Sequence, residues 1–436
     1  MEINYFKLNN LRNWKFLYII SAFIGPGLGY GKLYFFHIIL ILTNLFLLIK
    51  LHEDSYKINF TSILSKYNIV FIFWFIWSLL GLLWSANVNE TIKYLIYLLI
   101  GINCMFHVSS FISNERNFNK FLKIAKWILI TNVFFAILES FGIFRWPLSP
   151  FSIHAPLFGR ETENLNIGNL FLSGIYPPTG LFGNPNNLAV FCTVLMPFVI
   201  SLTKGLLRNM SVISILWICL TTGSRGSLIA LFIGLIFYIF FVKKNYNEII
   251  IFLISFTLML LALGIFTYKN DQNIITLFEN VNLLNLFQGI DARNLSSSGI
   301  RLALIADGWE AFIKSKGIGL AGGGTLVFQA KLGGYGDGIV RLHNFWLEIL
   351  FEGGIVLFFF IVLWFFSIFK KLLTIIKSNN KWESQFGKAT LISLIIFIFN
   401  IVSLSTAIYF LPMWIFFGTL TGFIYRNENF NFIRYK

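Results

Sequence analysis

The sequence predicts an all-α protein that crosses a lipid bilayer many times. Of its 436 residues, 57% are apolar and only 12% are charged, which is too little polar surface to cover a soluble protein of this size. Apolar runs of roughly 17 to 25 residues, the length that crosses a hydrocarbon core about 30 Å thick, recur along nearly the whole chain. These runs lack the alternation of a strand, and lipid tolerates few backbones other than helices. They are therefore expected to be transmembrane helices.

We expect about 12 spans in a single integral membrane domain that covers residues 1–436. They are placed at residues 16–31, 33–49, 67–84, 93–112, 127–144, 185–203, 210–222, 226–242, 248–267, 349–369, 389–404 and 406–425. The first two are joined through the glycine-rich residues 25–31, which are read as a turn or kink and not as a phosphate-binding loop.

The distribution of basic residues predicts the orientation of these spans. The net charge of +15 is spread over short segments between spans, which is typical of loops anchored at an anionic membrane face and not of a nucleic-acid site. Basic residues at 204–208, 243–244 and 370–388 fall on the same predicted side as the N-terminus. Both termini are thus expected inside, and two extracytoplasmic loops follow, residues 145–183 and the larger 268–344.

Cysteine usage gives no indication of a disulfide framework or a metal site. Cys104, Cys192 and Cys219 all lie within apolar runs, and their spacing matches no common ligand pattern. The cysteines therefore predict no metal site. We expect no cofactor either.

Arg225 lies where residues 222–227, Thr-Gly-Ser-Arg-Gly-Ser, interrupt one long apolar run from 211 to 242. An arginine inside a bilayer costs about 2.5 to 3.5 kcal/mol on insertion scales unless it faces water or an anion. A position at the outer mouth between two spans removes most of that cost. Two interpretations remain: an arginine that snorkels from a tight extracytoplasmic turn, and an arginine that binds an anion. Among basic residues, arginine is relatively more frequent on the predicted outer side, which favours a phosphorylated ligand.

His343 stands where the large outer loop becomes a membrane span, with Arg341 two residues before it and Glu348 and Glu352 after it. If Asn344 caps the following helix, the positive end of the helix dipole lowers the histidine pKa. A neutral imidazole can then accept a proton near pH 7. The alternative is an interfacial histidine satisfied by backbone groups. The two glutamates either orient the histidine, pair with an outer arginine, or form hydrogen bonds between helices.

The large outer loop is also expected to contain short helices. Residues 301–316 place six apolar side chains on one helical face, and glycines follow at 317, 319 and 322–324. The six are Leu302, Ile305, Ala306, Trp309, Phe312 and Ile313. This pattern predicts an amphipathic helix that lies on the outer interface.

Five motifs, taken together, resemble the O-antigen ligase and polymerase superfamily of bacterial membrane glycosyltransferases. In chain order they are residues 179–189 (Thr-Gly-Leu-Phe-Gly-Asn-Pro-Asn-Asn-Leu-Ala), residues 222–226, Arg301 with Gly317 sixteen residues later, His343-Asn344, and residues 352–354 (Glu-Gly-Gly). Each motif is weak alone, but their order, spacing and position beside one large loop cover roughly residues 175–365.

The resemblance implies a GT-C-like membrane enzyme that transfers glycans from undecaprenyl diphosphate outside the bacterial cytoplasmic membrane, without a metal or nucleotide sugar. Family arginines that bind the lipid diphosphate would correspond to Arg225 and Arg301, with Arg341 as a further candidate, and the family's loop histidine would correspond to His343. The histidine would activate an acceptor hydroxyl that attacks the anomeric carbon with inversion. Asn344, Glu348 and Glu352 would support the site.

Three classes of function remain open at this stage. Within the family, a polymerase joins lipid-linked repeat units, whereas a ligase delivers the finished glycan to lipid A core; the motifs do not separate the two, and we favour the polymerase. A lipid or polysaccharide transporter would place ionisable residues near the bilayer midplane or show repeated halves. A structural membrane subunit is a third class. The expected partners are the lipid-linked donor, a glycan or lipid-linked acceptor and membrane lipid, with a flippase and a chain-length regulator left open and nucleic acid not expected.

Overall fold

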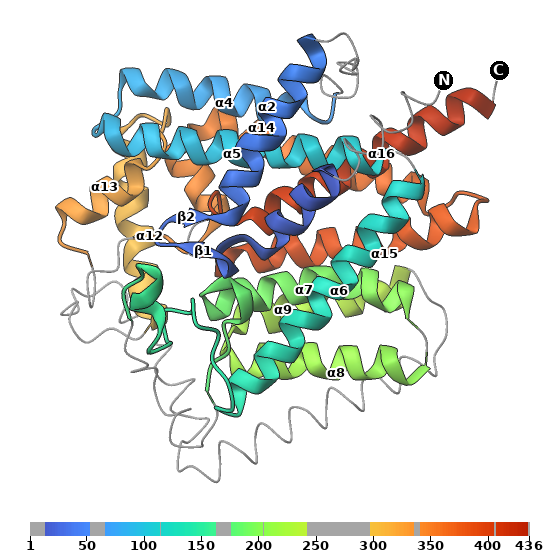
Figure 1. The fold of residues 1–436 in the computed structure, drawn as a ribbon. Helices are drawn as coiled ribbons and strands as arrows, with labels where there is room; N and C mark the ends of the chain where they lie inside the picture. The colour runs from blue at the N-terminus through green and yellow to red at the C-terminus, as the bar shows by residue number, and fades with distance from the viewer. Residues whose placement is uncertain are drawn as a thin grey trace.

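The computed structural model describes residues 14–52, 66–113, 115–162, 176–203, 205–241, 297–334, 341–404 and 407–434. These residues form a layered arrangement of helices, most of which run side by side, with α12 and α13 at one end (Figure 1). The elements, with η for a 3-10 helix, are a helical segment over residues 14–24, η1 (Gly25–Gly27), β1 (Gly29–Tyr30), β2 (Leu33–Tyr34), α2 (Phe35–His52), α4 (Ile69–Leu80), η2 (Gly81–Leu83), α5 (Val88–Ile112), α6 (Glu115–Ser140), η3 (Ala155–Phe158), η5 (Gly180–Phe182), α7 (Pro185–Leu202), α8 (Gly205–Thr221), α9 (Arg225–Phe241), α12 (Ser297–Lys314), α13 (Gly324–Lys331), α14 (Phe345–Ile375), α15 (Lys381–Asn400), η8 (Ile401–Ser403) and α16 (Leu411–Arg434).

A helix overlaps each predicted span that the structure describes, although several bounds differ, as for α6 (Glu115–Ser140 against 127–144) and α16 (Leu411–Arg434 against 406–425). Four are long and apolar enough to cross a membrane, over Val88–Ile112, Arg116–Ser140, Phe345–Ile375 and Lys381–Ser403. Shorter apolar helices cover Phe35–Ile49, Ile69–Leu83, Pro185–Ser201, Met210–Thr221 and Arg225–Tyr238. The predicted span 248–267 lies outside the described residues. The structure therefore confirms a mostly helical fold with four candidate membrane-spanning helices, while the total of about 12 spans, the orientation and the loop boundaries stay predictions.

One part of the all-α prediction is wrong. The first span was expected to continue to residue 31, but its helix ends at residue 24 and a 3-10 turn follows at Gly25–Gly27. Then β1 pairs with β2 in a short antiparallel hairpin. Gly25 and Gly31 have φ angles of +48° and +54°, a region that is open to glycine at little cost and that ends a right-handed helix.

Close contact between α5 and α16 depends on glycines that lie at their interface. A Cβ on Gly101 would stand 2.1 Å from the Trp414 ring, and one on Gly418 would stand 2.6 Å from the Met105 carbonyl oxygen. Small residues let helix backbones approach one another in membranes, where apolar side chains gain little by leaving lipid. This interface keeps α5 and α16 together.

Basic side chains gather at the end of the bundle away from the start of α14. Lys15 donates a hydrogen bond to Ser110 near the end of α5 (3.2 Å). Glu428 of α16 forms ion pairs with Lys66 (3.3 Å) and Lys371 (3.1 Å), and Lys371 lies near the last turn of α14. Since the part of α14 after its interruption at Gly354 spans roughly 30 Å at 1.5 Å per residue, the start of α14 lies well away from this end.

Candidate active site

His343 immediately precedes the cap of α14 and has an unusual backbone. The Asn344 side chain accepts hydrogen bonds from the backbone N–H groups of Trp346 (3.1 Å) and Leu347 (3.3 Å), which confirms the expected cap. His343 itself has φ of +52°, in the left-handed region that is costly for a residue with a Cβ. Its Nδ1 atom is buried and has no hydrogen-bond partner in the described part of the chain. Backbone strain and an unsatisfied polar atom both occur more often at functional sites than elsewhere.

The surroundings of His343 keep its imidazole neutral. The pKa of His343 is lowered to about 4. Burial is the largest cause, and the nearby positive charges of Arg301 and Arg341 add to it. The sequence predicted the direction of this shift from the helix dipole, but burial and two guanidinium groups account for it. At pH 7 the imidazole is therefore neutral, and its unprotonated nitrogen can accept a proton.

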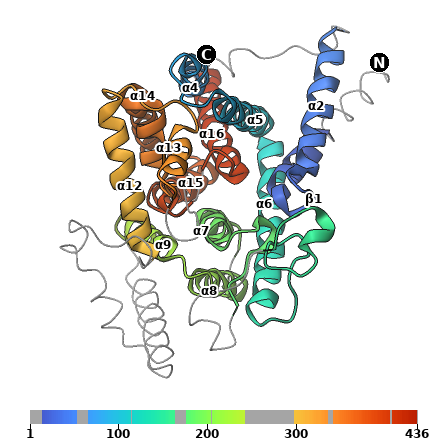
Figure 2. The same ribbon diagram turned by 90° about the vertical axis from the view of Figure 1, so that its left-hand side faces the viewer.

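Arg301 lies within electrostatic range of two other candidate residues, Arg225 and His343. Arg225 is the first residue of α9, Arg301 lies in the second turn of α12, and His343 directly precedes the cap of α14. Burial lowers the pKa of Arg301, and the like charge of Arg225 lowers it further. The two guanidinium groups therefore repel one another. The positive charge of Arg301 also lowers the pKa of His343. Figure 2 shows α12 reaching toward α9 at its lower end. Because α9, α12 and α14 are distant in sequence, this convergence is a property of the tertiary structure.

The start of α9 is fixed by a buried polar network beneath Arg225. Ser224 and Ser227 share a hydrogen bond of 2.8 Å, Ser227 donates to the Asn400 side chain (2.7 Å), and Asn400 donates to Thr193 (2.6 Å). Arg225 itself is exposed, as expected for a residue in a tight turn between two helices. The network explains why this polar motif occurs between two apolar helices.

The Gly353-Gly354 motif marks a break inside α14 that receives part of another loop. Gly354 has φ of +75° and ψ of 177°, which interrupts the helix. The backbone N–H of Leu320 donates to the Phe351 carbonyl (2.8 Å), and the N–H of Ile355 donates to the Gly317 carbonyl (3.0 Å). The loop after α12 therefore supplies backbone partners that the broken helix would otherwise lack.

Two tryptophans secure the same junction. The Trp77 indole donates to the Gly353 carbonyl (2.7 Å), and the Trp84 indole donates to the Gly319 carbonyl (3.2 Å). Both carbonyls belong to segments that have left regular helical structure. The break in α14 and the inserted loop are thus held as one unit with α4 and η2.

Glu348 and Glu352 form hydrogen bonds between segments. A Glu352 oxygen accepts a hydrogen bond from the Thr325 hydroxyl at the start of α13, and a Glu348 oxygen accepts from the Ala407 N–H (3.4 Å). Both carboxyl groups are buried. Of the three sequence-based alternatives, this is the inter-helix interpretation; no hydrogen bond to His343 is found from either glutamate within the described chain.

The amphipathic helix predicted at residues 301–316 is present as α12, but a different face packs against the protein. Leu304 and Phe312 join Leu342 and Phe351 in a small hydrophobic cluster. A Cβ on Gly308 would stand 2.7 Å from the Phe351 ring. Of the expected apolar face, Phe312 is buried, while Leu302, Trp309 and Ile313 are exposed. The exposed stripe matches a helix that lies on a membrane interface.

The motif at residues 179–189 has a structural partner that the sequence reasoning missed. Glu139, fully buried in α6, accepts hydrogen bonds from the backbone N–H groups of Thr179 (2.6 Å), Gly180 (2.9 Å) and Trp146 (3.0 Å). An acidic residue inside a predicted span was the available signal. These hydrogen bonds to Glu139 show that the motif fixes the loop before α7. Asn184 caps the first turn of that helix.

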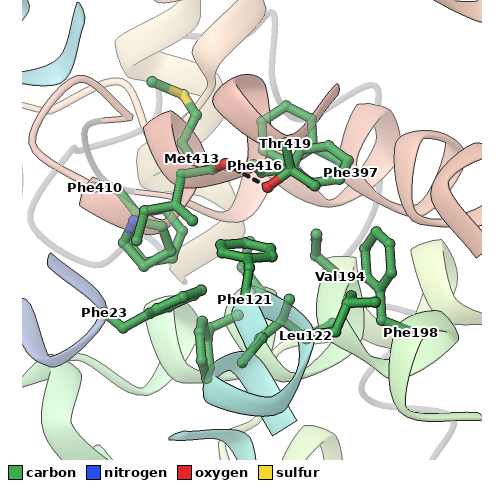
Figure 3. Close-up of a pocket in the computed structure, with 16 residues that line it drawn as sticks. Phe23, Phe121, Leu122, Val194, Phe198, Phe397, Phe410, Met413, Phe416 and Thr419 are labelled. Atoms are coloured by element: carbon green, nitrogen blue, oxygen red, sulfur yellow. Dashed lines mark hydrogen bonds between the residues drawn. The ribbon is translucent and has the colours of Figure 1, made fainter. Parts of the chain in front are cut away.

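One enclosed cavity lies away from these residues. It measures about 30 Å³ and is lined by apolar side chains of α6, α7, α15 and α16, including Phe121, Val194, Phe397 and Met413 (Figure 3). Its size is close to that of one water molecule, and its walls carry no group for acid–base chemistry. In the described ranges, no group of three or more His, Cys, Asp or Glu side chains is arranged to hold a metal ion.

The fold and the site define a multispan membrane protein with a histidine and arginines gathered at one end of its helices. Residues 210–362 match a family described as O-antigen ligase, and every candidate site residue falls inside that match. The chain is also 24% identical over 380 residues, 84% of its length and 73% of the relative's, to the teichuronic acid biosynthesis protein TuaE of Bacillus subtilis (strain 168). The chain thus carries an O-antigen ligase family domain, and the resemblance expected from its motifs is confirmed. Together the two matches support a membrane enzyme of polysaccharide biosynthesis.

Proposed function

We propose that this protein is a glycosyltransferase that polymerises undecaprenyl-diphosphate-linked oligosaccharide units into a surface polysaccharide. The observation that carries the proposal is that Arg301 of α12 lies within electrostatic range of both Arg225, at the start of α9, and His343, before α14. In the described structure, neither arginine forms an ion pair with a carboxylate. Two adjacent cations without an anion form a suitable site for a diphosphate.

Arg225 and Arg301 act on the leaving group. When the glycosidic bond breaks, its electron pair passes to the diphosphate oxygen, and the negative charge there increases. Guanidinium groups that are already in place stabilise this charge without reorganising, which lowers the barrier more than it stabilises the bound substrate. In this scheme the arginines provide the positive charge, and no metal ion is required.

His343 acts on the acceptor. The acceptor hydroxyl oxygen forms the new bond to the anomeric carbon from the face opposite the diphosphate, and the hydroxyl proton passes to the imidazole. The product therefore has inverted anomeric configuration. A histidine pKa near 4 makes a weak base, but a bound diphosphate offsets the repulsion from Arg301 and Arg341 and raises the pKa toward the working pH.

The arrangement of lysines supports a site that faces outward. Lys15, Lys66 and Lys371 lie at the end of the bundle opposite to His343. Because basic residues concentrate on the cytoplasmic side of membrane proteins, we place this end in the cytoplasm and the site on the exterior of the cytoplasmic membrane.

A ligase that transfers the glycan to lipid A core is the second candidate, favoured by the description of the matching family. It shares the donor chemistry and differs in the acceptor. The relative TuaE, named for teichuronic acid biosynthesis, instead favours assembly of a polymer.

Deletion of the gene followed by complementation tests the proposal. Wild-type protein is expected to restore full-length polymer, whereas His343→Ala and Arg301→Gln, checked for normal membrane abundance, leave single repeat units on the lipid carrier. Asp307→Asn, on the same helix as Arg301, serves as the matched control and is expected to restore the polymer. Full-length glycan stranded on undecaprenyl diphosphate would indicate the ligase, and normal polymer with His343→Ala would refute the role of the histidine.

A further inference from the structure

Arg341 faces a different set of side chains from those around Arg225 and Arg301. Its guanidinium lies 5.8 Å from the centre of the Tyr409 ring, close enough for a cation–π contact. Arg341 is exposed, and within the described ranges no carboxylate forms an ion pair with it. His343 thus has one pair of arginines formed by α9 and α12, and a separate arginine directed toward an aromatic surface.

That aromatic surface continues away from His343. The Tyr409 and Tyr97 rings meet edge to face with centres 4.2 Å apart. Tyr34 comes next, within electrostatic range of Tyr97 and of the Arg341 charge. Beyond it, the Arg160 guanidinium lies 5.7 Å from the Tyr34 ring centre. We call Tyr34, Tyr97 and Tyr409 the tyrosine row.

The row is held by contacts between the hairpin and the segment 145–162. The Gly31 N–H donates to the Phe158 carbonyl (2.7 Å), and Arg160 donates to the carbonyls of Pro26 and Leu148, both at 2.6 Å. Arg160 is therefore committed to the fold. Arg341, in contrast, is exposed, so its guanidinium is open to a ligand.

The row also has the exposure that a ligand requires. Tyr409 is 38% exposed, and Tyr34 and Tyr97 are half-buried. A phenol ring offers an apolar face and a polar edge on a stiff side chain, which suits a ligand that has both characters. Sugars have apolar C–H faces and polar edges, whereas a diphosphate has only the polar groups.

We propose that the tyrosine row binds the acceptor glycan, and that Arg341 pairs with the carboxylate of an acidic sugar in it. The donor diphosphate is then left to Arg225 and Arg301, and His343 lies between the two substrates. This inference rests on the proposed transferase function and assigns its acceptor side. It also gives Arg341 a different ligand from the lipid diphosphate, for which the sequence had made it a further candidate.

Arg341 suits a carboxylate because its planar fork can donate two parallel hydrogen bonds to the two oxygens. A neutral sugar could use the tyrosine rings but would leave the guanidinium without an anion. An acidic sugar satisfies both. The carboxylate would also reduce the repulsion between Arg341 and the imidazolium that forms when His343 accepts the proton.

Binding measurements on the full chain in lipid nanodiscs test this division with three probes: farnesyl diphosphate, methyl β-D-glucuronide and methyl β-D-glucoside. Arg341→Gln is expected to weaken glucuronide binding about tenfold or more, the usual effect of losing a charged hydrogen bond, and to leave farnesyl diphosphate binding unchanged. Arg301→Gln is expected to do the reverse. Tyr409→Ala is expected to weaken both sugars, and Arg341→Lys to recover part of the glucuronide binding. Melting temperatures close to wild type establish that each variant is folded.

Two results would overturn the inference: equal binding of glucuronide and glucoside by the wild-type protein, or a loss of farnesyl diphosphate binding in Arg341→Gln as large as in Arg301→Gln. Failure of the proposed function gives a different pattern. In that case Arg301→Gln and Arg225→Gln leave farnesyl diphosphate binding intact, while the effect of Arg341→Gln on the sugar is independent of it.

Discussion

Gly354→Ala should separate α12 from α14 and so disturb the site without touching any candidate catalytic side chain. Gly354 has φ of +75° and ψ of 177°, a conformation that is almost restricted to glycine. A Cβ at this position would stand 2.1 Å from the Ile318 carbonyl oxygen and 2.7 Å from the Gly317 carbonyl oxygen. Both are backbone atoms, which cannot turn aside as a flexible side chain can. The inserted loop must therefore move.

The cost follows from these contacts. The forced backbone conformation costs about 1 to 3 kcal/mol. Loss of the two backbone hydrogen bonds across the break, Leu320 to Phe351 and Ile355 to Gly317, adds about 1 kcal/mol each. We expect a destabilisation on the order of 3 to 5 kcal/mol, which is large against the 5 to 15 kcal/mol of a typical domain.

Gly333→Ala is the matched control. Gly333 has a similar φ of +90°, but a Cβ there meets no atom within 4 Å. Thermal unfolding in one detergent should show a clearly lower midpoint for Gly354→Ala than for Gly333→Ala, and only Gly354→Ala should lose polymer assembly in the deletion strain. Equal midpoints together with retained assembly would show that the inserted loop neither stabilises the fold nor positions the site.

Three further predictions concern charge and packing. Below a His343 pKa of about 4 the base is protonated, so the acidic limb of kcat/KM is expected near that pH; Arg341→Gln removes a positive charge and should move the limb to higher pH, whereas an unmoved limb would argue against this histidine as the base. Glu139→Ala removes the acceptor of three backbone N–H groups and should lower the yield of folded protein far more than Glu310→Ala, whose exposed side chain pairs with Lys314; similar yields would contradict the structural role. EDTA should leave glycan transfer by purified protein unchanged, and recovery of lost activity by Mg²⁺ would refute charge stabilisation by arginine alone.

Local sequence was sufficient where a feature depends on neighbouring residues. The Asn344 cap and the tight turn at residues 222–227 were both predicted, because capping and turn formation need only a few adjacent groups. Apolar length gave the positions of the helices for the same reason. The turn expected within residues 25–31 is present at Gly25–Gly27, but the hairpin at Gly29–Tyr34 was missed, since an apolar, glycine-rich run reads equally well as the end of a span.

Features that join distant segments could not be predicted from the sequence. The motifs containing Gly317 and Gly354 were recognised, but their meeting depends on backbone pairing between two loops that only folding brings together. The cause of the low His343 pKa was likewise assigned to its own helix, whereas burial and Arg301 on another helix are responsible. Glu348 and Glu352 are four residues apart and therefore lie on one face of α14, but the sequence could not show that their hydrogen-bond partners, Thr325 and Ala407, lie on other segments.

The sequence by itself determined the membrane environment, the helices and the family resemblance, because apolar length and short motifs are local properties. The tertiary structure decided which charged residues meet. Arg225, Arg301 and His343 come from three helices, and their proximity depends on the packing of α12 against the broken α14. It also directed Arg341 toward Tyr409, a contact between segments that no spacing in the chain could indicate.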